Sequence, residues 1–174
     1  MLNELTTDKY NVLIFGIRAL NTNSELKNCK KELFRFMNQG GKVIFQYNTT
    51  AELITDDFAP DSLFISRDRV TDEYASVRIL KPDHPAFNQF NKITPDDFDN
   101  WVQERGLYFP GRYSASYDEL LAMADPKEKE LRSGILISKV GKGYFVYSSL
   151  AWFRQLKAGV PGAYRLFSNL VSFE

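Results

Sequence analysis

Cys29 and His84 are the residues that could form a nucleophile and its base, and the chain holds one cysteine and one histidine. A thiol beside an imidazole can carry out covalent catalysis. Cys29, however, falls on the apolar stripe of a predicted helix that also includes Leu26, Leu33 and Phe36. A free cysteine at such a position is usually a small buried hydrophobe. We therefore expect Cys29 in the core and predict no catalytic residue.

His84 lies in the sequence Pro82-Asp-His-Pro85, which is similar in composition to the His-Pro-Asp-Asp sequence of zinc deacetylases. The order of the residues differs, and no second histidine exists to complete a zinc site of the Cys and His types. A single cysteine also excludes an internal disulfide. These counts predict a structural turn at His84, no metal site and no cofactor.

Arginine and acidic residues cluster at Arg67-Asp68-Arg69, at Asp72-Glu73 and at Glu104-Arg105. Guanidinium and carboxylate groups at this spacing can hold each other in a fixed network or contact a charged ligand. Paired or solvated surface charge is the commoner outcome. The clusters therefore favour a loop-rich, charge-paired region over a ligand contact.

Polar side chains follow the predicted strands at the points where those strands end. Arg18 comes after the first apolar run, Gln46 and Asn48 come after the second, and Trp152 and Arg154 follow a later one. Because parallel strands end at one edge of a sheet, where α/β folds bind ligands, we expect these side chains to converge. Amide and guanidinium donors beside an indole suit a sugar better than a phosphate, which calls for a glycine-rich loop. The predicted ligand-binding residues are Arg18, Gln46, Asn48, Glu104, Trp152 and Arg154. An ion pair between Arg18 and Glu104 is the competing arrangement.

Apolar runs predict the elements that position this site. Residues 10–16 and 42–47 are typical of strands buried on both faces. Between them, residues 26–37 form an amphipathic pattern that ends at Gly40-Gly41, and Thr22 with Glu25 matches a capping box at its start. A right-handed crossover makes the two strands parallel.

The middle of the chain is less regular, with short strands predicted at 63–66 and 76–80. Thr94-Pro95-Asp96-Asp97 matches a helix start, and we expect that helix to continue to Gly106.

Near the C-terminus, residues 135–140 and 144–149 predict a β-hairpin around Gly141-Lys142-Gly143, followed by an amphipathic helix over 163–171. The predicted fold class is α/β, with a three-layer, mostly parallel sheet flanked by helices and a β-hairpin near the C-terminus.

The composition limits the classes of function. Among 174 residues, 22 Lys plus Arg balance 22 Asp plus Glu, which disfavours a nucleic-acid partner. No run approaches the ~18 apolar residues of a membrane span, and residues 1–10 lack a signal-peptide pattern. We expect one domain over residues 1–174. Because the first strand begins so early, we also expect the chain to be part of a longer protein, whose compartment, exported or not, stays unassigned.

Five segments carry a resemblance to a known family: Phe15–Asn21, Gly40–Asn48, Ile65–Glu73, Trp101–Phe109 and Ala158–Leu166. They resemble the C-terminal domain attached to PIG-L (LmbE-like) deacetylases of Bacteroidetes-type bacteria, and the match spans nearly the whole chain. The resemblance implies a flavodoxin-like, class I glutamine amidotransferase-like fold of the ThuA type. It also implies a separate zinc-dependent N-acetylglucosaminyl deacetylase domain in the parent protein, with a first strand and helix of the present domain upstream of Tyr10.

Two departures from the family matter for activity. The aspartates and histidines of the deacetylase motif are missing, and so is the amidotransferase cysteine, because Gln46-Tyr47-Asn48 follows the strand after Gly40. The resemblance therefore implies a non-catalytic accessory domain. Its expected partners are the deacetylase catalytic domain of the same parent chain and a glycan.

Two alternatives stay open. One is an independent hydrolase or transferase that uses Ser148 or Ser149 with a carboxylate such as Glu104, although the one histidine sits in a proline-flanked turn. The other is a structural domain that forms homo-oligomers through aromatic and arginine residues. An open polar surface at the strand ends favours binding, and a broad apolar face favours docking.

Overall fold

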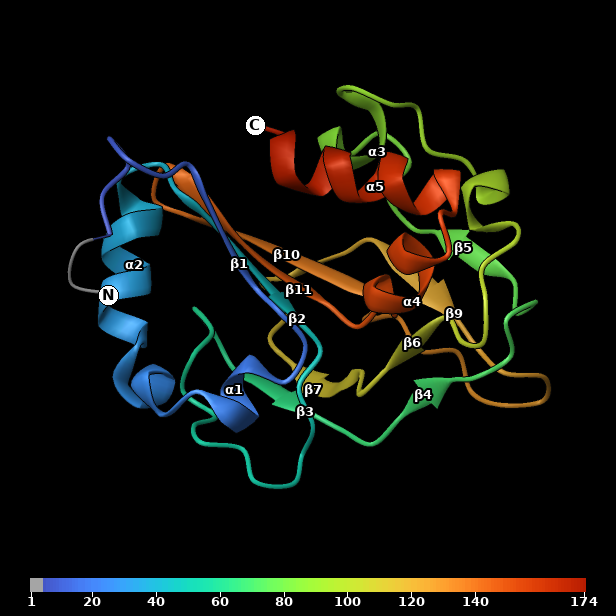
Figure 1. Cartoon of the computed structure of the whole chain (residues 1–174), viewed down its shortest axis with the longest axis horizontal. Helices are drawn as coiled ribbons and strands as arrows, with labels where there is room; N and C mark the ends of the chain where they lie inside the picture. Colours follow the sequence, from blue (N-terminus) through green and yellow to red (C-terminus); the bar gives the residue numbers. More distant parts are fainter. Residues whose placement is uncertain (1–4) are drawn as a thin grey trace.

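The central sheet places the two predicted parallel strands side by side. The computed structural model describes residues 5–174, in which the sheet has the order β1–β2–β11–β10–β8 (Figure 1). The strands are β1 (Val12–Phe15), β2 (Lys42–Gln46), β8 (Asp118–Glu119), β10 (Ile135–Val140) and β11 (Gly143–Ser148). β2 is parallel to both β1 and β11, whereas β10 is antiparallel to both of its neighbours. The fold is therefore mixed α/β.

The prediction of a mostly parallel sheet is confirmed for β1, β2 and β11 but not for the rest of the sheet. The predicted hairpin is confirmed as β10 and β11, with Val140 opposite Gly143 at the turn. A tight hairpin reverses the chain, so its first strand must run antiparallel to its second. The hairpin thereby brings antiparallel pairing into the sheet.

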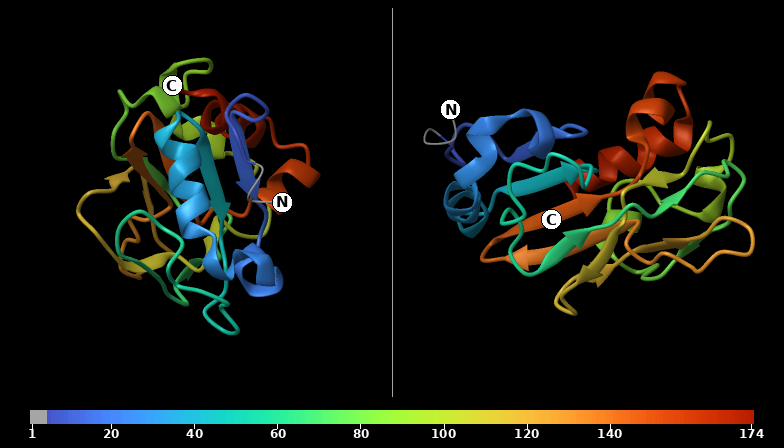
Figure 2. Two further views of the ribbon diagram at one scale, coloured as in Figure 1. Left: turned by 90° about the vertical axis from the view of Figure 1, so that its left-hand side faces the viewer. Right: turned by 90° about the horizontal axis from the view of Figure 1, so that it is seen from below.

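Helices pack on both faces of the central sheet because its strands are apolar on both faces. Val43 and Ile44 are neighbours in β2 and belong to different core clusters. Val43 packs with residues of α2 (Lys30–Asn38), and Ile44 packs with residues of α5 (Pro161–Ser172). Figures 1 and 2 show these helices on opposite sides of the strands. The expected closing helix over 163–171 is confirmed as α5.

Three two-stranded antiparallel sheets, β3–β7, β4–β6 and β5–β9, form the rest of the β-structure described in residues 5–174. Their bounds are β3 (Leu63–Ile65), β4 (Arg69–Val70), β5 (Val77–Ile79), β6 (Gly106–Leu107), β7 (Pro110–Tyr113) and β9 (Leu121–Met123). The predicted strands at 63–66 and 76–80 are confirmed as β3 and β5. Strands β6, β7 and β9 are too short to show a periodic pattern, and the sequence did not predict them.

The start of the predicted helix over 26–37 differs from the capping-box expectation. Asn23 Oδ1, rather than Thr22, accepts the Glu25 N–H, and a 3₁₀ turn precedes α2. The glycine stop is confirmed, because α2 ends at Asn38 and Gly40 follows with φ 110°. The short helices are α1 (Ala19–Thr22), η2 (Ser24–Asn28), α3 (Pro85–Asn88), η3 (Pro95–Phe98) and α4 (Trp152–Lys157).

The predicted helix from Thr94 to Gly106 is wrong beyond its first turn. Asp97 accepts the Thr94 N–H as expected, but the helix is only the 3₁₀ turn η3. Asn100 then adopts a left-handed conformation with φ 59°, which a continuing helix cannot contain. The side chain of buried Gln155 hydrogen-bonds both the N–H and the C=O of Val102 at 2.8 and 2.9 Å. These tertiary bonds replace the helical ones.

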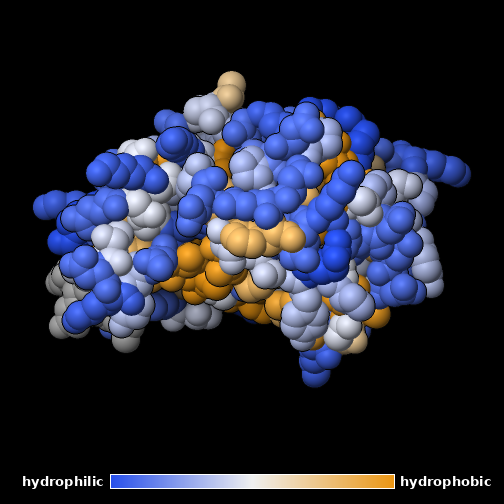
Figure 3. Space-filling view, turned by 90° about the horizontal axis from the view of Figure 1, so that it is seen from above, coloured by the Kyte–Doolittle hydropathy of each residue, from blue (hydrophilic) through white to orange (hydrophobic). Residues whose placement is uncertain are grey.

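The surface of the face seen from above is largely hydrophilic, with hydrophobic patches near its middle (Figure 3). Ile14, an aliphatic residue of the edge strand β1, is 45% exposed. No helix in this part of the chain combines the length and apolarity required to cross a membrane.

Candidate functional site

The carboxyl ends of β1, β2 and β11 meet at one edge of the sheet, as the parallel pairing requires. Side chains that follow these strands contact residues from the loops on either side of β6. We call this group the carboxyl-edge cluster; its members are Arg18, Tyr47, Glu104, Tyr108, Phe153 and Arg154. It joins three of the predicted ligand-binding residues, Arg18, Glu104 and Arg154, to three aromatic rings.

Tyr47 is the centre of the aromatic part of the cluster. Its ring stacks on Tyr108 with centroids 5.7 Å apart and lies 6.1 Å from the Phe153 ring. Tyr47 itself is buried, whereas Tyr108 and Phe153 are half-buried and so keep part of each ring at the surface. Aromatic ring surface of this kind can contact the apolar face of a sugar or another flat ligand.

The charged part of the cluster contains one ion pair. Arg154 Nε donates to Glu104 Oε1 at 2.5 Å, and the Arg154 guanidinium also lies 4.7 Å from the Phe153 ring centroid. Glu104 therefore pairs with Arg154, and the competing Arg18–Glu104 arrangement is not adopted. Because the Glu104 side chain is only 13% exposed, its pairing restrains the Arg154 side chain.

The pKa of Tyr47 is raised above its ordinary value. Burial is the main cause, and the negative charge of Glu104 adds to it, while Arg154 and Arg18 act in the opposite direction. The hydroxyl of Tyr47 is therefore protonated near neutral pH. It can donate or accept a hydrogen bond but does not serve as an anionic nucleophile.

Arg18 enters the cluster through its backbone. It has φ 59°, and its N–H donates to the Tyr47 carbonyl at 2.9 Å, which ties the end of β1 to the end of β2. Tyr108 also has a left-handed backbone, with φ 52°. Non-glycine residues in this conformation store strain and recur at binding sites. The Arg18 side chain is exposed, and among residues 5–174 no group bonds its guanidinium.

Two other predicted site residues are buried and serve the structure. Asn48 is fully buried; its Oδ1 accepts the Leu20 N–H at 2.8 Å, and its Nδ2 donates to the Gln46 carbonyl at 2.9 Å. Trp152 is 1% exposed, and its indole N–H donates to Ser148 Oγ at 2.8 Å. Its ring is therefore not a platform for a sugar in this structure. The half-buried Gln46 is the last residue of β2, at the expected edge of the sheet.

The residues considered for catalysis are held by structural contacts. Ser148 and Ser149 are fully buried, and Ser149 Oγ donates to the Ser133 carbonyl. Cys29 is 1% exposed, as predicted, and burial raises the pKa of its thiol to about 11. His84 Nδ1 accepts the Ala86 N–H at the start of α3. Ser148, Ser149 and Cys29 are therefore buried in the interior, and His84 caps a helix.

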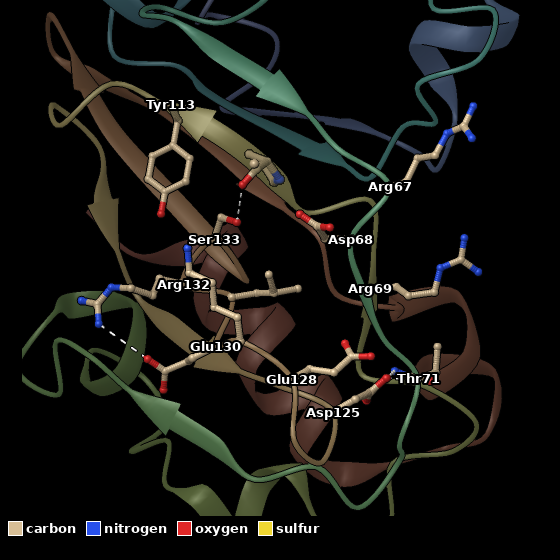
Figure 4. A pocket seen from close by; sticks show the side chains of 14 residues that line it. Arg67, Asp68, Arg69, Thr71, Tyr113, Asp125, Glu128, Glu130, Arg132 and Ser133 are labelled. Atoms are coloured by element: carbon tan, nitrogen blue, oxygen red, sulfur yellow. Dashed lines mark hydrogen bonds and ion pairs between the residues drawn. The ribbon is translucent and has the colours of Figure 1, made fainter.

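A polar pocket of about 580 Å³ lies beside the small sheets (Figure 4). Several of its charged side chains are held by neighbouring groups: Asp125 accepts the backbone N–H groups of Thr71 and Asp72, and Arg132 pairs with Glu119 of β8 at 2.7 Å. The Asp125 contacts join the segment after β4 to the segment after β9. In residues 5–174 no group of three or more His, Cys, Asp or Glu side chains is arranged to hold a metal ion.

Sequence reasoning missed the aromatic members Tyr47, Tyr108 and Phe153. Tyr47 and Phe153 are each adjacent in sequence to a predicted site residue, Gln46 and Arg154, and this adjacency was the available signal. Tyr108 reaches the cluster because it follows β6, whose pairing with β4 the sequence does not indicate.

Comparison with known proteins gives similarity at the level of fold. No protein-family model matches the sequence, and no curated protein is significantly similar to it. Among solved structures, the cytoplasmic protein STM3548 from Salmonella typhimurium is similar with a TM-score of 0.61 at 14% identity, over 98% of this chain and 73% of that one.

Two β-galactosidases contain a similar domain. The enzyme from Bacillus circulans sp. alkalophilus gives a TM-score of 0.54 and that from Rahnella sp. R3 a TM-score of 0.55, both at 13% identity. Each match covers 96% of this chain but only 23% of the enzyme. At these identities the comparisons show a shared mixed α/β fold.

Proposed function

We propose that this chain is a non-catalytic, saccharide-binding accessory domain with a class I glutamine amidotransferase-like, flavodoxin-like fold. The observation that carries the proposal is the carboxyl-edge cluster, which combines half-buried aromatic rings with arginine donors at the sheet edge where α/β folds bind ligands. The parent enzyme is of the PIG-L N-acetylglucosaminyl deacetylase type, whose C-terminal domains the sequence resembles.

The partial coverage of the β-galactosidases supports an accessory role. In those two proteins a domain of this fold makes up about a quarter of a larger enzyme, with 23% of each chain matched. The fold therefore occurs within carbohydrate-active proteins that are much longer than this chain. We extend that arrangement to this chain as part of the proposal.

Binding is favoured over the hydrolase alternative by what surrounds the nucleophile candidates. A serine nucleophile needs access to substrate and a neighbouring base. Ser148 Oγ instead accepts the Trp152 indole N–H, and both Ser148 and Ser149 are fully buried. The groups that remain at the surface of this edge are aromatic ring faces, a carboxylate paired with an arginine, and guanidinium donors.

Titration of N-acetylglucosamine oligomers tests the proposal by calorimetry or chemical-shift changes. The wild-type protein should bind them, and Tyr108→Ala should weaken binding about tenfold because a stacking face is lost. Tyr74→Ala removes a tyrosine that is 82% exposed elsewhere and is the matched control. Absence of binding at millimolar ligand, or equal binding by Tyr108→Ala and wild type, refutes the proposed function.

A further inference from the structure

Three exposed arginines near the carboxyl-edge cluster have no carboxylate partner within residues 5–174. Arg69 places its guanidinium carbon 5.8 Å from the Tyr108 ring centroid, and Arg67 Nε lies 3.5 Å from Thr50 Oγ1. The guanidinium of Arg18 is unbonded, as described above. All three are therefore charged groups without internal neutralisation.

Arg67, in the segment between β3 and β4, and Arg69, the first residue of β4, point to the same side of the chain. Both residues line the polar pocket, but Figure 4 shows their guanidinium groups directed away from it, while Asp68 between them faces it. The Asp68 carboxylate accepts the Ser66 Oγ–H at 2.7 Å. The nearest acid in sequence thus does not neutralise the two arginines.

Contacts around Tyr47 and Tyr108 link the three arginines. Arg18 bonds the Tyr47 carbonyl through its N–H, Arg69 lies against Tyr108, and Tyr47 and Tyr108 stack on each other. Arg67 contacts Thr50, which follows Tyr47 by three residues. The one carboxylate in the cluster, Glu104, already pairs with Arg154. The edge therefore carries an excess of positive charge in a chain whose formal net charge is zero.

Several other arginines of the described chain have a carboxylate partner, whereas Arg112 lies over the Phe64 ring. Arg78, Arg132 and Arg165 each pair with a carboxylate at 2.5–2.7 Å. A solvated arginine is common at a protein surface, but three around one aromatic pair, each without a carboxylate partner, leave their guanidinium donors available to a bound anion.

We propose that the saccharide bound at this edge carries an oxyanion, either a carboxylate or a phosphate, held by Arg18, Arg67 and Arg69. This inference rests on the proposed function and specifies its ligand class. Guanidinium groups bind both oxyanions through paired N–H donors. The sugar ring lies against Tyr108 and Phe153, and the anionic group faces the arginines. An acidic saccharide uses both parts of the surface, whereas a neutral one uses only the rings.

The test compares three probes at one ionic strength: a neutral N-acetylglucosamine oligomer, a galacturonate oligomer of the same length and N-acetylglucosamine 6-phosphate. At least one acidic probe should bind about tenfold more tightly than the neutral one, and added salt should reduce that difference. The carboxylate and phosphate arms show which oxyanion is preferred. Inorganic phosphate alone should bind more weakly than the preferred saccharide.

Arg69→Gln and Arg18→Gln should each lower the affinity for the acidic probe far more than the affinity for the neutral probe, which removes most of the preference. Arg112→Gln is the matched control, because Arg112 is also exposed but lies 4.2 Å over the Phe64 ring on β7. Equal affinity for neutral and acidic probes overturns the oxyanion inference and leaves the proposed function standing. Absence of binding to every saccharide refutes the proposed function itself.

Discussion

The imidazole of His84 caps α3, and its Nδ1 must be unprotonated to do so. That nitrogen accepts the Ala86 N–H at 3.1 Å, and a protonated ring could not accept it. Burial lowers the pKa of His84 below its ordinary value of 6.5; nearby Asp118 opposes this shift and Lys81 adds to it. The unfolded chain therefore binds the proton more readily than the folded one. The stability that depends on neutral His84 is present above pH 6.5 and is lost as the pH falls toward the lowered pKa.

Urea unfolding of wild type and His84→Asn at about pH 8 and about pH 5.5 checks this dependence. Asparagine is a good helix cap and does not titrate, so the wild type should lose more stability than His84→Asn on acidification. Carboxylates titrate in both proteins and cancel in the comparison. Identical pH dependence of the two proteins would show that His84 is not the responsible group.

Cys29 should be a packing residue with no part in ligand binding. It is 1% exposed, and burial raises the pKa of its thiol to about 11, so the reactive thiolate is rare at neutral pH. Cys29→Ala should cost about 1 kcal/mol of stability and leave saccharide affinity unchanged. A thiol reagent should label the native protein far more slowly than the urea-unfolded one. Rapid native labelling would contradict this assignment.

The sequence predicts those residues of the candidate site whose place depends only on where a strand ends. Arg18 and Arg154 lie at the expected sheet edge because they follow strands, and strand ends can be read from apolar runs. Asn48 and Trp152 follow strands too, but the sequence does not tell which side chains the loop turns inward. Asn48 accepts the N–H of Leu20 in α1, and Trp152 packs against Phe167 of α5.

At the scale of elements, Gln155 of α4 determines the conformation of the segment after η3. Its amide bonds the N–H and C=O of Val102, and Gln155 is fully buried. Gln155→Met keeps the volume but leaves the Val102 N–H without its acceptor and removes the donor to the Val102 and Glu104 carbonyls, so it should destabilise the fold by about 2–3 kcal/mol. Urea denaturation measures the loss. Gln46→Met, the same change at a half-buried position, should be nearly neutral, and equal losses would contradict the argument.

Elements with a repeating pattern could be predicted, and those held by single tertiary bonds could not. β1, β2, the β10–β11 hairpin and α5 each have an apolar pattern that fixes their type. The segment after Thr94 has a good helix start, yet Gln155 supplies the bonds that a helix would have supplied. That partner lies more than fifty residues away along the chain, and no local pattern reports it.

At the scale of the whole molecule, one core cluster connects the central sheet with the small sheets. It contains Ile44 of β2, Leu121 of β9, Leu166 of α5 and both tryptophans, Trp101 and Trp152. The tryptophan rings lie 5.8 Å apart, so their fluorescence reports on this shared core. A continuous core predicts that the two regions unfold together.

Tryptophan fluorescence and far-ultraviolet circular dichroism should therefore give coincident urea transitions. Leu121→Ala supplies the sharper test, because Leu121 is fully buried in β9 while helices α2 and α5 dominate the dichroism signal. The substitution removes core packing and should cost about 3 kcal/mol, moving both transitions by the same amount. If the small sheets were an independent unit, Leu121→Ala would shift the fluorescence transition and leave most of the dichroism change in place. Coincident shifts would show that the carboxyl-edge cluster stands on a single cooperative framework, so that the elements carrying Arg69 and Tyr108 remain folded as long as those carrying Arg18 and Tyr47.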